Sequence, residues 1–138
     1  MTLLRTTDEL RRTLGSLLEP EGITLQQYNV LRILRGAGEG GLPTLEIGRR
    51  MVERQPGVTR LVDRLLVKGL VERTRGREDR RRVVCAILPQ GLALLRRVDQ
   101  TMEEMDLAVL RDVGAEDLAR MVPLLDRLRA AVRGLADG

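Results

Sequence analysis

The chain has 138 residues, of which 43% are hydrophobic and 32% charged, with a formal net charge of +4, and this size predicts one domain or one small domain with added oligomerisation elements. One cysteine and no histidine exclude an internal disulfide, a conventional zinc or copper cluster and a histidine-dependent catalytic site, so we expect no enzyme, no metal and no cofactor. No apolar run approaches the roughly 18 residues of a membrane span, and residues 1–10 lack the pattern of a signal peptide, so we expect a cytoplasmic protein with no membrane partner.

Two helices are predicted at the start of the chain. Residues 6–9 (TTDE) match a capping box, in which Thr6 bonds forward and Glu9 bonds back, and leucines follow at helical spacing until Pro20. Residues 24–27 (TLQQ) repeat this pattern before a second helix, which a glycine-rich segment should end. The apolar stripe of the second helix consists of Leu25, Tyr28, Leu31 and Leu34.

Two shorter helices follow. Thr44 is expected to cap the first, which carries Leu45, Ile47 and Met51. The second is expected to have Pro56 in its first turn and to end at Gly69. Its apolar residues have helical spacing and are Val58, Leu61, Val62, Leu65 and Leu66. Two short helices, of which the second is amphipathic and basic on its outer side, are typical of a helix-turn-helix.

Beyond Gly69 the apolar period changes to two, which predicts strands at residues 71–75 and 83–88 around a basic loop. A hairpin directly after a helix-turn-helix predicts a winged-helix unit that binds nucleic acid. Residues 49–82 contain 12 basic and five acidic side chains, a net charge of +7, so the rest of the chain sums to −3. Such a local basic surface indicates nucleic-acid binding, although a solvated basic face gives the same charge run.

Two long helices are predicted at the end of the chain, one from Pro89 and one after Gly114. Their apolar residues alternate steps of three and four, which is typical of a narrow seam between helices. A winged helix is already closed by its first helices and its hairpin. We therefore expect these two helices and the first helix to form a symmetric dimer with a second chain, with a kink at Pro123.

Two segments resemble the MarR family of winged-helix transcription regulators. Residues 57–73 (GVTRLVDRLLVKGLVER) correspond to a recognition helix, a glycine stop and the first wing strand. Residues 78–91 (EDRRRVVCAILPQG) contain an acidic-x-Arg wing motif, the second strand and the start of a long helix. The resemblance covers nearly the whole chain. It implies a mainly α fold with a small β-hairpin wing (an α+β winged helix) and a homodimer formed through the N- and C-terminal helices.

The resemblance also implies an organisation and a function. It places a dimerisation helix at residues 1–22, a winged helix-turn-helix DNA-binding domain at 23–90 and dimerisation helices at 91–138. It implies a dimeric transcription regulator, namely a repressor that a small aromatic or apolar effector releases from DNA. This regulator would bind a pseudo-palindromic operator in double-stranded DNA, with its recognition helix in the major groove and its wing in the minor groove. The alternative is a winged-helix module that binds nucleic acid non-specifically or another protein.

The expected DNA-binding residues follow from this correspondence. Those of the recognition helix are Arg54, Gln55, Pro56, Gly57, Thr59, Arg60 and Arg64, and those of the wing are Arg73, Arg75, Arg77, Asp79, Arg80, Arg81 and Arg82. Arg60 is expected to bind either a guanine or a phosphate. Arg81 is expected to enter the minor groove, oriented by a charge-assisted pair with Asp79.

Three further residues have two interpretations each. Tyr28 and Met51 either line an effector pocket or pack in the core, and the absence of Phe, Trp and His favours the core. Cys85 is either a redox sensor or a buried structural residue, and its place in a β-rich segment favours burial.

Overall fold

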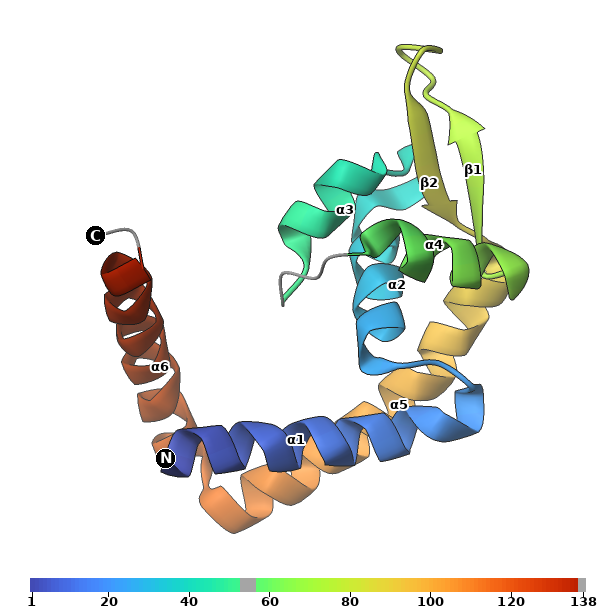
Figure 1. Ribbon diagram of the computed structural model, residues 1–138. Helices are drawn as coiled ribbons and strands as arrows, with labels where there is room; N and C mark the ends of the chain where they lie inside the picture. The colour runs from blue at the N-terminus through green and yellow to red at the C-terminus, as the bar shows by residue number, and fades with distance from the viewer. Residues whose placement is uncertain (53–56, 137–138) are drawn as a thin grey trace. The chain divides into compact units, whose positions relative to one another are not determined.

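The computed structural model describes residues 1–52 and 57–136, and it is mainly helical with one β-hairpin (Figure 1). In chain order the elements are α1 (Thr2–Leu18), the 3₁₀ turn η1 (Glu19–Glu21), α2 (Leu25–Ala37), the 3₁₀ turn η2 (Gly38–Gly40), α3 (Thr44–Arg50), α4 (Val58–Val67), β1 (Val71–Arg75), β2 (Val83–Ile87), α5 (Pro89–Val113) and α6 (Ala115–Ala136). The predicted fold class, a mainly α protein with a hairpin wing, is confirmed. The expectation for Pro56 lies outside the described residues.

The chain divides into two compact units, Met1–Asp99 and Gln100–Gly138. In the first unit, α2 contacts α1, α3, α4 and β2, so it forms the centre of the core. The fully buried side chains of this core include Leu18, Val30, Leu31, Leu34, Ile47, Val62, Leu65 and Leu95. Burial of these aliphatic side chains is the main source of stability for the winged helix.

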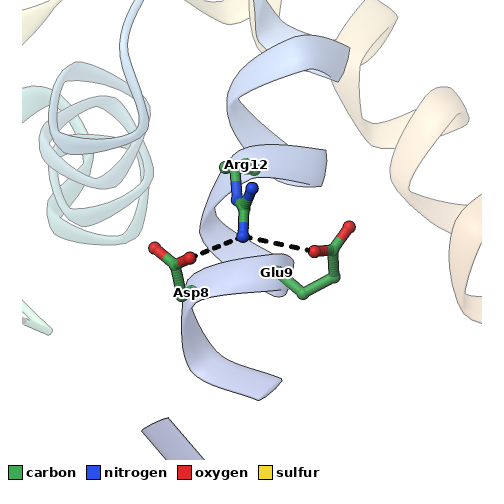
Figure 2. Close-up of polar contacts among 3 residues, drawn as sticks. All are labelled: Asp8, Glu9 and Arg12. Atoms are coloured by element: carbon green, nitrogen blue, oxygen red, sulfur yellow. Dashed lines mark hydrogen bonds and ion pairs between the residues drawn. The ribbon is translucent and has the colours of Figure 1, made fainter. Parts of the chain in front are cut away.

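The capping box predicted at the start of α1 is wrong. The helix begins at Thr2, and the hydroxyl of Thr6 donates to the carbonyl of Thr2 at 3.0 Å. A threonine inside a helix commonly bonds the carbonyl four residues back. Glu9 does not serve as its partner, because its carboxylate faces Arg12 at 3.5 Å, and Arg12 also bonds Asp8 at 2.6 Å on the exposed side of the helix (Figure 2).

The capping box predicted for α2 is confirmed. The Gln27 N–H donates to the Thr24 hydroxyl at 3.2 Å, and the Thr24 N–H donates to Oε1 of Gln27 at 3.0 Å. Gln27 is buried, and these bonds satisfy its backbone N–H and its side-chain Oε1 at the helix start. The stripe that follows reaches the core through Tyr28, Leu31 and Leu34.

The start of α3 differs from the prediction. Pro43 is the N-cap residue, and its carbonyl accepts from the N–H of Ile47 at 3.1 Å. Thr44 is therefore the first helical residue and not the cap, because the extended backbone of Pro43 already turns the chain into the helix. Ile47 is fully buried, and Met51 lies just beyond the end of the helix, where it is also buried.

The end of α4 matches the prediction for Gly69. Gly69 has a φ of +71°, its N–H donates to the carbonyl of Leu66, and the N–H of Leu70 donates to that of Leu65. This pair of bonds is a Schellman motif, which requires a left-handed residue and so favours glycine. The motif ends the helix sharply and starts β1 two residues later.

The hairpin is antiparallel, with Arg73 opposite Cys85 and Arg75 opposite Val83. Its base is buried through Val71, Val84, Cys85 and Ala86, and its loop projects beyond α3 and α4 (Figure 1). Cys85 is 1% exposed, as the core interpretation predicted.

The base of the wing also contains a bridge that sequence patterns did not predict. Cys85 exchanges two backbone bonds with Leu42, of 2.8 and 2.9 Å. Gly41 permits this approach, because a Cβ on it would lie 2.4 Å from the Cys85 carbonyl oxygen. The wing is thereby attached to the segment that leads into α3.

The C-terminal helices retain exposed apolar side chains. The first part of α5 contributes Leu95 and Val98 to the core of the first unit, whereas α6 has no buried residue among those described. The exposed apolar residues of α6 include Leu128, Val132 and Leu135. None of the described helices is long and apolar enough to cross a membrane.

Candidate nucleic-acid interface

One side of α4 is polar and exposed, and the other packs into the core. Val62 and Leu65 are fully buried, whereas Thr59, Arg60 and Arg64 are exposed. Because an α-helix has 3.6 residues per turn, these two sets of side chains lie on different sides of the helix. Gly57 precedes the helix with a φ of +100° and is also exposed. Of the expected recognition residues, Arg54, Gln55 and Pro56 lie outside the part of the chain that the structure describes.

The helix-turn-helix is closely packed where α3 meets α4. A Cβ on Gly48 of α3 would lie 3.4 Å from a methyl group of Val58 at the start of α4. The two helices therefore approach each other over a glycine. Sequence reasoning did not single out Gly48, although a glycine inside a short helix is a signal of close packing.

Two arginines at the end of α3 add to the basic surface. Arg49 and Arg50 are exposed and both face Glu46, at 3.7 and 2.9 Å. The hydrogen bond from Arg50 lowers the pKa of the Glu46 carboxyl below its usual value. Glu46 thus stays ionised and offsets part of this positive charge.

An ion pair joins α4 to the wing. Oδ1 of Asp63 lies 2.6 Å from Nη2 of Arg73 on β1. This hydrogen bond to Asp63 is the main cause of a raised pKa of Arg73, to which the thiol of Cys85 also contributes. Sequence reasoning missed this pair, because its partners come from different elements.

The wing loop is held in a tight turn by backbone bonds. The Gly76 N–H donates to the Arg82 carbonyl at 2.8 Å, and the Arg82 N–H donates to the Asp79 carbonyl at 3.1 Å. Oδ1 of Asp79 accepts from the backbone N–H of Arg81 at 3.0 Å. The predicted pairing of Asp79 with the guanidinium of Arg81 is therefore wrong. An aspartate in a turn commonly bonds the backbone two residues on instead.

The wing carries a dense positive charge. Residues 75–82 include five arginines and two acids, a net charge of +3, and all five arginines are exposed. Arg75 donates to the carbonyl of Arg80 at 3.1 Å, across the loop. Arg77 lies 3.6 Å from Glu39 of η2, but both side chains are more than three-quarters exposed, so this pair is weak. The loop can therefore present guanidinium groups to an anionic ligand.

The residues proposed for an effector pocket lie inside the first unit. Tyr28 and Met51 are each 8% exposed, and the guanidinium of Arg32 lies 5.7 Å from the centre of the Tyr28 ring. In the described part of the chain, no three acidic, cysteine or histidine side chains gather where they could hold a metal ion.

Comparison with known proteins gives consistent matches. A model of the MarR family matches residues 21–82. The multiple antibiotic resistance protein MarR of Salmonella typhimurium is 29% identical over 118 residues, which are 85% of this chain and 81% of that protein.

Two solved structures extend these matches to the fold. A MarR transcription factor from Planctomyces limnophilus is 35% identical, with a TM-score of 0.68 and 90% of each chain covered. A mutant of MarR from Escherichia coli, complexed with operator DNA, is 26% identical with a TM-score of 0.79, and the match covers 92% of this chain and 91% of that one.

Proposed function

Because the chain belongs to the MarR family of transcription regulators, we propose that it binds double-stranded operator DNA as a homodimer. The observation that carries this proposal is the exposed positive surface formed by α4 and the wing, with the charge of the rest of the chain being negative. The likeness to a MarR structure that holds operator DNA supports the same function.

We propose that α4 enters the major groove. The groove admits an α-helix, and the base edges in it distinguish all four base pairs. Thr59, Arg60 and Arg64 are exposed on α4, and Arg60 is the residue proposed to bind a guanine or a phosphate. Residues 54–57, which precede this helix in the sequence, are proposed to complete the contact. The N–H groups in the first turn of a helix favour a phosphate.

The wing is proposed to lie in the adjacent minor groove. A narrow minor groove has a strong negative potential that attracts arginine. Arg81 is proposed to enter it, and Arg75, Arg77, Arg80 and Arg82 are proposed to bind phosphates. Asp79 contributes by shaping the loop, since its carboxylate holds the backbone of Arg81.

The dimer is proposed to form through α1, α5 and α6. Exposed apolar side chains on these helices support this, among them Leu4 on α1 and Leu128 on α6. The corresponding division of the chain is 1–22 and 91–138 for dimerisation and 23–90 for DNA binding. A two-fold dimer reads two half-sites about 34–36 Å apart, which accounts for a pseudo-palindromic operator.

We also propose that the protein represses transcription and is released by a small aromatic or apolar effector. Membership in the family supports this, and Tyr28 and Met51 are the side chains proposed to respond to the effector. A screen of such compounds for loss of operator binding tests the idea. Compounds that bind the protein without changing DNA affinity would argue against release by effector.

The test of the main proposal is selection of bound duplexes from a random pool. We expect an enriched inverted repeat, with specific affinity at least about 10³-fold above that for unrelated DNA. Binding with no enriched sequence would favour the alternative of a non-specific nucleic-acid module. No binding to any duplex would overturn both.

A further inference from the structure

We propose that Asp63 and Arg73 form a strut that sets the position of the wing relative to α4, so that Arg73 is a positioning residue and not a DNA contact. The inference rests on the proposed DNA binding and assigns to Arg73 a role different from that of the other wing arginines. Asp63 is a carboxylate on the side of the recognition helix that is proposed to face an anion.

Asp63 lies on the same side of α4 as residues proposed to contact DNA. Asp63 follows Thr59 by four residues and Arg60 by three, so these three side chains share one side of the helix, and all are exposed. A negative charge there repels DNA phosphates. The carboxylate by itself therefore weakens DNA binding, and its presence on this side of α4 needs a structural reason.

The ion pair of Asp63 with Arg73 gives such a reason. Its Oδ1 lies 2.6 Å from Nη2 of Arg73, and the two side chains are half-exposed, at 51% and 36%. An exposed ion pair contributes little to the free energy of unfolding. Its larger effect is geometric, because it joins α4 directly to β1.

Arg73 lies where the wing leaves the core. Its cross-strand partner Cys85 is 1% exposed, whereas every residue from Arg75 to Val83 except Gly76 is exposed. A small rotation of the hairpin at Arg73 therefore displaces the loop by a larger distance. The ion pair with Asp63 therefore holds the hairpin at the point from which the exposed loop extends.

The engaged guanidinium also distinguishes Arg73 from the loop arginines. Asp63 already occupies its donor groups in part, and the charge of the carboxylate offsets the attraction of Arg73 for phosphate. The guanidinium of Arg75, in contrast, bonds a neutral backbone carbonyl and keeps its full net charge.

A double-mutant cycle on operator affinity tests the strut. We expect Asp63→Ala and Arg73→Ala each to weaken binding about two- to fivefold, and the double variant to be no weaker than either, since each removes the same contact. If Arg73 instead binds phosphate, Asp63→Ala strengthens binding, Arg73→Ala weakens it and the two effects add. That result would overturn the proposal.

Two further variants separate positioning from charge and from folding. Glu72→Ala removes one negative charge from the neighbouring exposed position on β1, and we expect it to leave affinity unchanged or to raise it. Asp63→Glu keeps a carboxylate within reach of Arg73 and should restore most of the affinity lost in Asp63→Ala. Failure of Asp63→Glu to restore binding, with an unchanged melting temperature, would contradict the strut.

The same experiments distinguish failure of the strut from failure of the proposed function. If the unaltered protein binds no operator, the proposed function fails, and the strut, which rests on it, fails with it. If it binds but Asp63→Ala is at least as tight, only the strut fails. Melting temperatures close to that of the unaltered protein confirm that affinity, and not folding, is compared.

Discussion

At the scale of single residues, glycine is required at position 76 because two parts of the wing backbone lie close together there. A Cβ on Gly76 would lie 2.7 Å from the carbonyl oxygen of Asp79, which is nearer than real Cβ atoms approach. We expect Gly76→Ala to displace the loop and to weaken operator binding about tenfold, equivalent to about 1.4 kcal/mol. A DNA titration measures this, and Gly40→Ala, which has open space around its Cβ, is the control. Unchanged affinity in Gly76→Ala would show that the loop shape does not matter for binding.

Arg60 and Arg81 are the residues that should contribute most to recognition. We expect alanine at either position to weaken operator binding by about 1–3 kcal/mol, because each removes a charge-assisted contact with DNA. Their exposure predicts little change in melting temperature. Arg12→Ala, on the exposed side of α1 (Figure 2), removes the same charge outside the basic surface and should have a small effect. A loss of folding in the Arg60 or Arg81 variant would contradict their assignment as surface contacts.

The sequence predicts some of these residues better than others, for physical reasons. The exposed side of α4 follows from its apolar period, so Thr59, Arg60 and Arg64 could be identified. The bond from Arg73 to Asp63 could not, because it depends on the angle at which β1 leaves α4. The bond of Asp79 to a backbone N–H was missed because its charge suggested a guanidinium partner.

At the scale of elements, a local sequence motif predicts the end of a helix correctly where only one backbone geometry is compatible with that motif. Gly69 ends α4 in a left-handed conformation, which few other residues adopt, and its place in the sequence was sufficient to predict it. The Thr6 motif failed, because a threonine followed three residues later by glutamate occurs equally well inside a helix. The difference lies in the surroundings: Thr24 follows a turn that interrupts the helix, and Thr6 does not.

Gly69→Ala tests the importance of the helix stop. We expect it to lower the free energy of unfolding by about 1–2 kcal/mol, because alanine is strained at a φ of +71°. Chemical denaturation with circular dichroism measures the loss. Gly36→Ala is the matched control: Gly36 lies inside α2 with open space around its Cβ, so alanine there should stabilise by about 0.5–1 kcal/mol. Equal effects of the two substitutions would contradict the argument from backbone conformation.

At the scale of the whole molecule, the apolar residues of the C-terminal helices fall into two groups, one buried in the core and one exposed. The sequence predicted a seam between helices along both, but Leu95 and Val98 are buried within the first unit, whereas Leu128, Val132 and Leu135 are exposed. Periodicity identifies an apolar side of a helix and does not say which surface covers it. The exposed part of the seam is therefore the part on which the proposed dimer depends.

A charge on this seam should separate the subunits and change how the protein binds DNA. We expect Leu128→Arg to shift sedimentation at micromolar concentration from dimer to monomer, since an arginine cannot be buried unpaired in an apolar interface. The unaltered dimer should lose affinity with salt at a log–log slope of about −5 to −9 if it neutralises six to ten phosphates, and a monomer at about half that slope. Ala130→Arg adds the same charge on the other side of α6 and should change neither quantity. A Leu128→Arg protein that stays dimeric, or an unaltered protein that sediments as a folded monomer, would show that α6 does not form the interface.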